Sequence, residues 1–227
     1  STVHATGIAN ALFANVTNVD DTSFTIAQAK VSGGSYAAVD SATTSSDGQP
    51  VAGSYGTLTV GADGSYVYVV NNSNGTIQSL DETQTEIDTF VVTVSDGSGG
   101  VVEQTLNITI QGTNDTPLTS GALSDTGAVE AGVDGDGPVE GSNATGIANA
   151  LFANVTDVDD TSFTIAQAKA SGGSYASVDS ATTSSDGLAV AGSYGTLTVG
   201  ADGSYDYAVD NSNGTIQSLD ETQTEID

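Results

Sequence analysis

Residues 55–70, with the sequence YGTLTVGADGSYVYVV, decide the fold class of this chain. Leu, Val and Tyr alternate with other residues on both sides of GADGS, and Asp63-Gly64 within it is a strong signal for a tight β-hairpin turn. Residues 89–110, TFVVTVSDGSGGVVEQTLNITI, repeat this arrangement with β-branched runs around DGSGG. These runs and turns predict an antiparallel, all-β protein.

The remaining elements are less regular. We expect a strand over residues 23–28 and a short helical turn over residues 74–80. Residues 28–54 are rich in Ser, Gly, Ala and Thr, which predicts either a long loop or an added hairpin. Residues 7–16, GIANALFANV, fit either a helix with one apolar face or an irregular strand.

The chain contains one long internal repeat. Residues 7–88 return as residues 146–227, an offset of 139 residues, with eight differences over 82 positions. Copying of this kind lengthens a spacer but adds little to a catalytic domain. We therefore predict two tandem β-sandwich domains, over residues 1–117 and 118–227.

The two copies are not equivalent in extent. Residues 89–117 follow the first copy, whereas the second copy stops at Asp227, the equivalent of Asp88. We expect the strands at 89–95 and 101–110 to lie centrally and to bury much of the first core. The second domain should then be frayed, unless later residues of a longer chain or a neighbouring molecule supply the missing strands.

The charge of the chain excludes several classes of partner. It has 29 Asp and Glu residues against two Lys and Arg residues, and a formal net charge of -27. Such a chain repels the phosphates of nucleic acids and anionic membrane surfaces. No apolar run is long enough to insert into a membrane. Cations are the favoured partners, above all calcium, which takes about six to eight oxygen ligands in irregular geometry.

Acidic residues gather in two equivalent turns, NVDD at 18–21 and DVDD at 157–160. Alternating carboxylates on an extended segment can converge on one cation, and the linker, the start of the second domain and the DGSGG turn offer further oxygens. The alternative is a set of solvated turns, in which Asn and Asp serve loop geometry alone. The candidate calcium ligands are Asn18, Asp20, Asp21, Asp96, Asn114, Asp115, Glu130, Asp157, Asp159 and Asp160.

Other acidic residues are weaker candidates. Asp63 and Asp202 lie in GADGS turns and are expected to be turn residues only. Asp134 and Asp136, in GVDGDGP, could bind a cation or merely keep a linker soluble.

Several motifs resemble those of a known family. GTLTVGADGSYDYAVDNSN (195–213), TFVVTVSDGSGG (89–100) and ITIQGTNDTP (108–117) resemble the VCBS repeats of very large bacterial surface and secreted proteins. ALFANVTDVDDTSFT (150–164) is similar to the related bacterial cadherin-like repeats. The resemblance implies tandem Greek-key β-sandwiches of cadherin-like or immunoglobulin-like type, calcium at the domain junctions, export by a dedicated one-step secretion system, and a role in adhesion or biofilm.

The chain departs from the family pattern at two places. The cadherin-like form has an acidic residue where this chain has Val16 and Val155, and the first copy has Asn18 where the second has Asp157. Both changes reduce the local negative charge, so the resemblance implies weaker metal binding in the first copy.

Catalytic side chains are scarce. His4 is the only histidine, and Asn143 takes its place in the second copy, which excludes a repeated Ser–His–Asp triad. There are no cysteines, so the usual zinc ligands are reduced to this one histidine. We predict that the protein is not an enzyme.

These observations predict a structural module: a calcium-stiffened stalk or fibre of an extracellular bacterial adhesin or biofilm matrix protein. Its partners would be copies of itself. The alternative is an adhesion module that binds a surface glycan or a protein. The chain has no Trp, and its alternating tyrosines are expected to face the core on one side. These tyrosines are Tyr66, Tyr68, Tyr205 and Tyr207.

Overall fold

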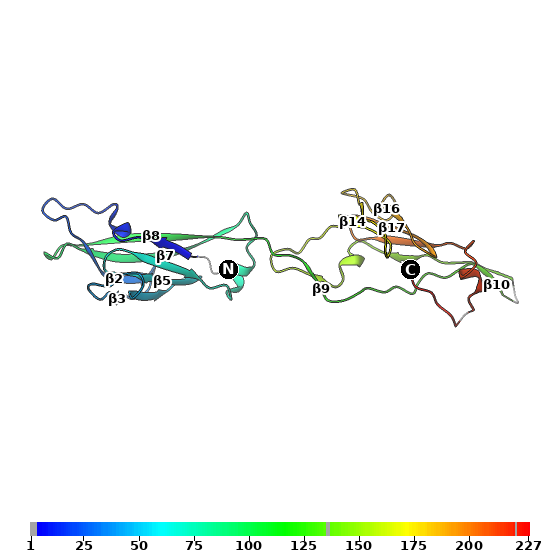
Figure 1. Ribbon diagram of the computed structural model, residues 1–227, viewed down its shortest axis with the longest axis horizontal. Coiled ribbons are helices and arrows are strands. Elements are labelled where there is room, and N and C mark those ends of the chain that lie inside the picture. The colour runs from blue at the N-terminus through cyan, green and yellow to red at the C-terminus, as the bar shows by residue number, and fades with distance from the viewer. Residues whose placement is uncertain (1–3, 135–136, 221) are drawn as a thin grey trace. The chain divides into compact units, whose positions relative to one another are not determined.

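The computed structural model describes residues 4–134, 137–220 and 222–227 (Figure 1). The chain folds into two units, Ser1–Asp115 and Thr116–Asp227. Every strand pairing between described residues is antiparallel, and the helices are single turns. The predicted all-β fold class is therefore confirmed.

The first unit is a sandwich of two four-stranded sheets. One sheet has the strand order β1-β6-β5-β4, and the other has the order β3-β2-β7-β8. The strands are β1 (His4–Gly7), β2 (Thr25–Val31), β3 (Ala37–Ala38), β4 (Gln49–Ala52), β5 (Gly56–Val60), β6 (Tyr66–Val70), β7 (Thr85–Ser95) and β8 (Val101–Gln111). The helical turns are η1 (Ala11–Phe13) and α1 (Gly75–Gln78).

Both predicted hairpins are present. β5 pairs with β6 from Gly56↔Val70 to Val60↔Tyr66, and β7 pairs with β8 over their full length. Gly64 has a φ of 77°, a left-handed conformation that a side chain would strain. Asp63 closes the same turn, because its Oδ1 accepts hydrogen bonds from the Ser65 N–H at 3.0 Å and the Ser65 hydroxyl at 2.6 Å. The DG dipeptide therefore predicts this turn because Gly adopts the left-handed conformation and the Asp side chain closes the turn.

The expectation that both long strands lie centrally is wrong for one of them. β7 lies between β2 and β8, but β8 is an edge strand, paired only with β7 among the described residues. Its side chains explain this position. Ile108 and Ile110 are buried, whereas Val101 is 65% exposed and most of the strand's other residues are polar and exposed. A polar edge of this kind resists pairing with other chains.

The two ambiguous segments have mixed structures. Within residues 28–54, β2 continues to Val31 and forms a short hairpin with β3, while β4 pairs with β5. The rest of that segment has no strand. The segment at 7–16 begins as the end of β1, turns at Asn10 with a left-handed φ of 67°, and continues as the 3-10 turn η1. Each prediction was therefore correct only in part.

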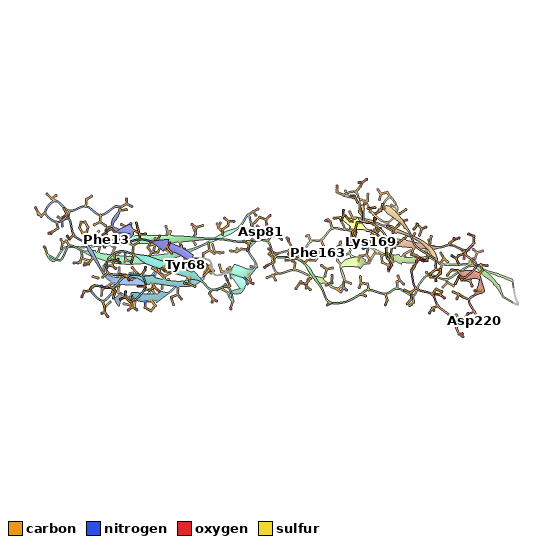
Figure 2. The ribbon with its side chains drawn as sticks, in the orientation of Figure 1. Phe13, Tyr68, Asp81, Phe163, Lys169 and Asp220 are labelled. Carbon is orange, nitrogen blue, oxygen red and sulfur yellow. The ribbon has the colours of Figure 1, made fainter. Side chains whose placement is uncertain are left out.

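The core of the first unit lies between its two sheets. Leu58 and Tyr68 from one sheet, and Ile26, Phe90 and Val92 from the other, are all but inaccessible to solvent. The ring of Tyr68, which is labelled in Figure 2, meets that of Phe90 edge to face across the interface, and their centroids are 5.9 Å apart. This geometry is a favoured one for aromatic pairs.

A buried carboxylate fastens the two sheets. Asp88 of β7 is 1% exposed. It accepts hydrogen bonds from the Tyr68 hydroxyl at 2.7 Å, the Ser54 N–H at 2.9 Å and the Tyr55 N–H at 3.1 Å. A Cβ atom at Gly53 would collide with the Asp88 carboxylate, so the turn between β4 and β5 can approach it only as glycine. Three donors offset the cost of removing this charge from water.

The second unit has one complete four-stranded sheet, in the order β12-β18-β17-β16, and three two-stranded ribbons, β10-β11, β13-β9 and β14-β15. Its strands are β9 (Leu118–Thr119), β10 (Gly132–Asp134), β11 (Gly137–Val139), β12 (Ala144–Gly146), β13 (Val155–Thr156), β14 (Gln167–Ala168), β15 (Ala176–Ser177), β16 (Leu188–Ala191), β17 (Gly195–Val199) and β18 (Tyr205–Val209). Its helical turns are η2 (Ala150–Phe152) and η3 (Ile216–Ser218).

The core of the second unit is much smaller. The buried cluster consists of Val178, Val199 and Ala201. Leu197 and Tyr207, the equivalents of the fully buried Leu58 and Tyr68, are only half-buried. Among the described residues of this unit, no strand takes the place of β7 and β8 over this core.

Replacing Asp88 should destabilise the first unit. In Asp88→Ala the Tyr68 hydroxyl and two backbone N–H groups lose their acceptor, and we expect a loss of about 3 kcal/mol in the free energy of unfolding. The measurement is urea dependence of amide hydrogen exchange in β7. Asp20→Ala, at an exposed position, is the control and should change stability by less than about 0.5 kcal/mol. Equal effects of the two substitutions would contradict the role of Asp88.

The same contact predicts a loss of stability at alkaline pH. Burial, together with the hydrogen bond to Asp88, raises the pKa of the Tyr68 hydroxyl above its usual value of 10.0. The unfolded chain therefore loses this proton at about pH 10 while the folded unit keeps it, so stability falls as the pH rises further. Tyr68→Phe should be less stable at pH 7 but should lose less stability above pH 10. Thermal melting of both proteins across this pH range is the measurement. Tyr66→Phe, which keeps the Tyr68–Asp88 pair, is the control.

Candidate metal centre

The DVDD turn of the second unit holds two carboxylates side by side. Asp157 and Asp159 are half-buried and follow β13, which β9 positions by antiparallel pairing. The Asp159 N–H donates to Asp157 Oδ1 at 3.1 Å, so the turn closes on itself. Asp160 is exposed. The DVDD turn therefore presents oxygen ligands at the surface of the unit.

One oxygen of Asp157 has no hydrogen-bond donor among the described residues. Asp157 Oδ2 is shielded from solvent and accepts no hydrogen bond from the described residues. The adjacent Asp159 side chain, as a hydrogen-bonding partner, lowers the pKa of the Asp157 carboxyl. Asp157 is then ionised at neutral pH, and two neighbouring carboxylates need a shared proton or a cation to offset their repulsion. The chemistry of this pair fits a hard cation.

In the equivalent turn of the first unit, a side-chain amide takes the place of one carboxylate. Asn18, which replaces Asp157, donates its side-chain amide to Asp96 Oδ2 at 3.1 Å. The other oxygen of Asp96 accepts the N–H groups of Ser98 and Gly100, both at 2.8 Å, within the turn between β7 and β8. Asn18 Oδ1 accepts the Asp20 N–H at 3.0 Å. The pairing of Asn18 with Asp96 brings together two predicted ligands that are 78 residues apart.

The remaining predicted ligands have other surroundings. Asp20 is exposed and Asp21 is half-buried in the NVDD turn. The Asn114 side-chain amide donates to the backbone carbonyl of Asp115. Glu130 accepts a hydrogen bond at 2.7 Å from Gln217 of η3. In residues 4–134, 137–220 and 222–227, no group of three or more His, Cys, Asp or Glu side chains is arranged to hold a metal ion.

The weaker candidates have different outcomes. Asp202 repeats the turn role of Asp63, since its Oδ1 accepts the Ser204 N–H at 2.9 Å and the Ser204 hydroxyl at 2.5 Å. Asp134 lies in β10, and Asp136 lies outside the described residues.

Sequence reasoning missed the buried carboxylate of Asp88 and its exposed counterpart in the second unit, Asp227. Asp227, the equivalent of Asp88, accepts the Tyr207 hydroxyl at 2.6 Å and the N–H groups of Ser193 and Tyr194 at 2.5 and 3.0 Å. A partial signal was present in the first copy, because Asp88 precedes the β-branched run at 89–95 and lies at a buried position of β7.

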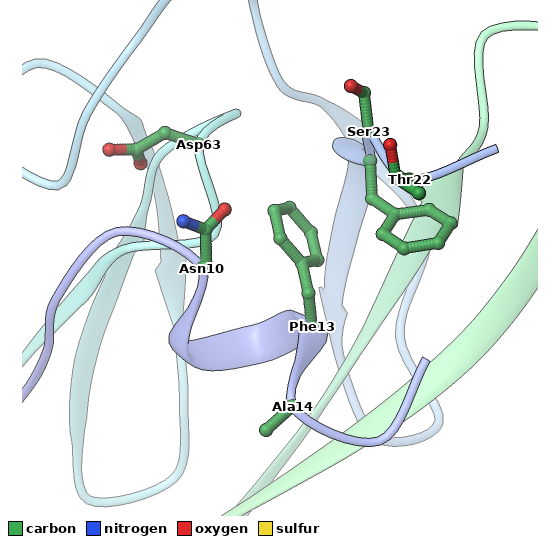
Figure 3. A pocket seen from close by; sticks show the side chains of 7 residues that line it. Asn10, Phe13, Ala14, Thr22, Ser23 and Asp63 are labelled. Carbon is green, nitrogen blue, oxygen red and sulfur yellow. The ribbon is translucent and has the colours of Figure 1, made fainter. Parts of the chain in front are cut away.

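A hollow of about 550 Å³ lies beside η1 (Figure 3). Figure 3 shows Asn10 and Asp63 on one side of Phe13, with Thr22 and Ser23 on the other. The ring of Phe13 is 6.0 Å from that of Phe24, and the second unit repeats this pair with Phe152 and Phe163 at 5.9 Å. Phe13 is only 8% exposed, so it is not a flat platform for a sugar. Asp63 is the single titratable side chain of the seven lining residues, which leaves no pair for acid–base catalysis.

A comparison with known protein families matches the first unit. Residues 1–112 match the model of the bacterial cadherin-like domain. The match includes both sheets of the sandwich and supports the cadherin-like family. Bacterial cadherin-like domains are structural or adhesion modules typical of extracellular and surface proteins, and they are not enzymatic.

No curated protein matches the chain. Among the described residues, no helix is both long and apolar enough to cross a membrane.

Substituting Asn18 of the NVDD turn by Asp, the residue at this position of the DVDD turn, should make the stability of the first unit depend on cations. Asn18→Asp removes the amide donor of Asp96 and places two carboxylates together, which should cost about 1 kcal/mol at low salt. Millimolar calcium should restore much of this loss. The control is Asn15→Asp, which adds the same charge at an exposed position three residues earlier. If calcium changes the stability of both variants equally, the Asn18–Asp96 hydrogen bond does not play the role of a bound cation.

Proposed function

We propose that this chain forms part of the stalk or fibre of an extracellular bacterial adhesin or biofilm matrix protein, in which each unit is a mechanical spacer. The observation that carries this proposal is the duplication of a scaffold. Asp227 repeats the hydrogen bonds of Asp88, Asp202 repeats the turn of Asp63, and Phe152 with Phe163 repeats the aromatic pair. Duplication that preserves the framework and adds no reactive group lengthens a molecule.

The family evidence supports the same role. The cadherin-like match covers a structural type of domain, and the motifs at 108–117 and 195–213 resemble the VCBS repeats of large surface and secreted proteins. Copies of the unit would be the main partners along such an array. The net charge of -27 favours a stalk that repels its neighbours and stays extended when cations are scarce.

Calcium is the cation proposed to stiffen the stalk. Asp157 and Asp159 would supply the central carboxylates, because they are adjacent and because Asp157 Oδ2 is buried without a donor. Water and the other predicted ligands would complete the six to eight oxygens that calcium takes. When bound, the ion would neutralise the pair and fix the DVDD turn in one conformation. The first unit, with its Asn18 amide, would bind calcium more weakly.

Binding to a glycan or a protein is the alternative, and one exposed aromatic residue bears on it. Tyr175 is 64% exposed, with the Lys169 ammonium 4.5 Å from its ring centroid. The equivalent Tyr36 in the first unit donates its hydroxyl to Glu103 of β8. The exposure of Tyr175 therefore does not by itself identify a sugar platform.

Calcium should raise the melting temperature of the protein. At a free concentration about 100 times the Kd, an ion that binds only the folded state adds about 2.7 kcal/mol. For a unit of this size such a gain corresponds to a shift on the order of 10 °C. Calorimetric melting in millimolar calcium and in excess chelator measures it. Superimposable curves would remove calcium from the proposal.

The ligand assignment can be tested separately. Asp157→Ala and Asp159→Ala should each weaken calcium binding by about tenfold or more, since even outer-shell partners of a metal often cost that much. Asp202→Ala is the matched control, because its carboxylate is occupied by Ser204 within a turn. Isothermal titration of the three variants gives the affinities. A loss of equal size at all three positions would show that the assignment is wrong.

A further inference from the structure

We propose that residues 118–131 of the second unit form a detachable strap, which leaves the surface of the unit reversibly while the rest of the unit stays folded. The strap contains β9 and ends just before β10, and Figure 1 shows it as the green trace that leads from one to the other. Its use as a reserve of length rests on the proposed function of a mechanical spacer. Its detachment is a property of the fold, and it is tested without reference to that function.

The beginning of the strap is attached by a very short ladder. β9 pairs with β13 over two residues, and Ser120 extends the ladder by donating its N–H to the Asn154 carbonyl at 3.0 Å. The Asn154 side-chain amide donates to the carbonyl of Gly121. Further along, the Tyr205 hydroxyl donates to the carboxylate of Asp125. A two-residue ladder contributes few cooperative hydrogen bonds, so this end of the strap opens by breaking only a handful of contacts.

The end of the strap is held mainly by two side chains of the second copy. Asn211 Oδ1 accepts the Ala131 N–H at 2.8 Å. Gln217 donates its amide to Glu130 at 2.7 Å and to the Ala131 carbonyl at 3.3 Å. These contacts use side-chain amides at the surface, where water can replace either partner.

The strap contributes no buried side chain to the unit. All its residues are exposed or half-buried, and its large apolar side chains, Leu118, Leu123 and Val129, are 68%, 44% and 49% exposed. Hydrogen bonds between exposed groups give little net free energy, because water forms equivalent bonds when they open. Detachment also uncovers little apolar surface, so the hydrophobic effect hardly opposes it. These are the properties of a segment with low local stability.

The first unit shows that a sandwich of this type does not need the strap. Its described residues contain no counterpart of residues 118–131, yet Ile26, Leu58 and Phe90 are all but inaccessible to solvent. The two side chains that hold the end of the strap recur in that unit as Asn72 and Gln78. Detachment of the strap therefore removes surface contacts of the second unit and leaves its four-stranded sheet paired.

Charge and length make the detached strap useful in a spacer. The strap carries Asp125 and Glu130 and no basic residue, in a chain with a net charge of -27, so detachment moves like charges apart. Its 14 residues (131 − 118 + 1) span at most about 48 Å at about 3.4 Å per residue. Under tension, this length becomes available before any core residue is exposed.

Hydrogen exchange of the full chain, in the presence of chelator, tests detachment without force. The reporters are the amides of Ser120, Val129 and Ala131, each of which donates a hydrogen bond, and the reference amides are those of β17. We expect the strap amides to exchange at least about tenfold faster than the reference. Their rates should change little with urea, because detachment exposes little surface. Equal rates with equal urea dependence would overturn the proposal, since the strap would then open only with the whole unit.

Equivalent residues of the two copies provide a matched pair of variants. Gln217→Ala removes the donor to Glu130 and to the Ala131 carbonyl, and should speed exchange at Ala131 about threefold or more. Gln78→Ala makes the same change in the first unit and should leave exchange of the strap unaltered. An effect of the same size from both variants, or from neither, would contradict this attachment.

A reversible disulfide tests whether the strap supplies length. The chain has no cysteine, and Thr119 and Val155 are direct partners in the ladder, so Thr119→Cys with Val155→Cys places two thiols within reach of one bond. When the reduced protein is stretched from its ends, we expect a first extension of at most about 48 Å at low force. The oxidised form of the same variant should lack it. A first extension that persists after oxidation, or none in the reduced form, would overturn the proposal. The calcium melting series judges the spacer's proposed stiffening separately.

Discussion

The buried carboxylate of Asp88 is the interaction on which the first sandwich depends. It accepts donors from Tyr68 of the facing sheet and from the turn between β4 and β5, so one charge joins three separate parts of the unit. A buried charge is costly unless all its oxygens are used, and here the cost enforces one arrangement of β7 against β6. That arrangement in turn brings Phe90 onto the ring of Tyr68 and keeps β7 as an inner strand of its sheet, between β2 and β8.

The second unit shows how much this contact contributes by itself. Asp227 repeats the carboxylate with all three donors, yet Leu197 and Tyr207 are only half-buried. The hydrogen bonds of Asp227 orient the residues around it, but they cover no apolar surface. Burial comes from the residues that follow Asp88 in the first unit, because Phe90, Val92 and Val94 fill the space between the sheets. In the first unit, Asp88 thus orients β7, and the apolar residues that follow it form the core.

Local signals in the sequence predicted the local structure well. The two DG turns and the alternating runs located β5 to β8, because turn geometry and side-chain alternation depend on neighbouring residues. The edge position of β8 and the burial of Asp88 were not predicted, because both depend on partners far away in the sequence. The candidate metal residues show the same limit. The composition of the NVDD and DVDD turns was visible, but the contact between Asn18 and Asp96, 78 residues apart, was not.

One substitution between the copies changes how negative charge is balanced. An amide at position 18 donates to Asp96 and leaves that turn satisfied by the protein alone. A carboxylate at position 157 has no proton to donate at neutral pH, and its Oδ2 is buried without a donor. Under the proposed function, the exchange of one NH₂ group for one oxygen would convert a self-contained turn into one that gains from a cation. The two units would then respond differently to the cations in the surrounding solution.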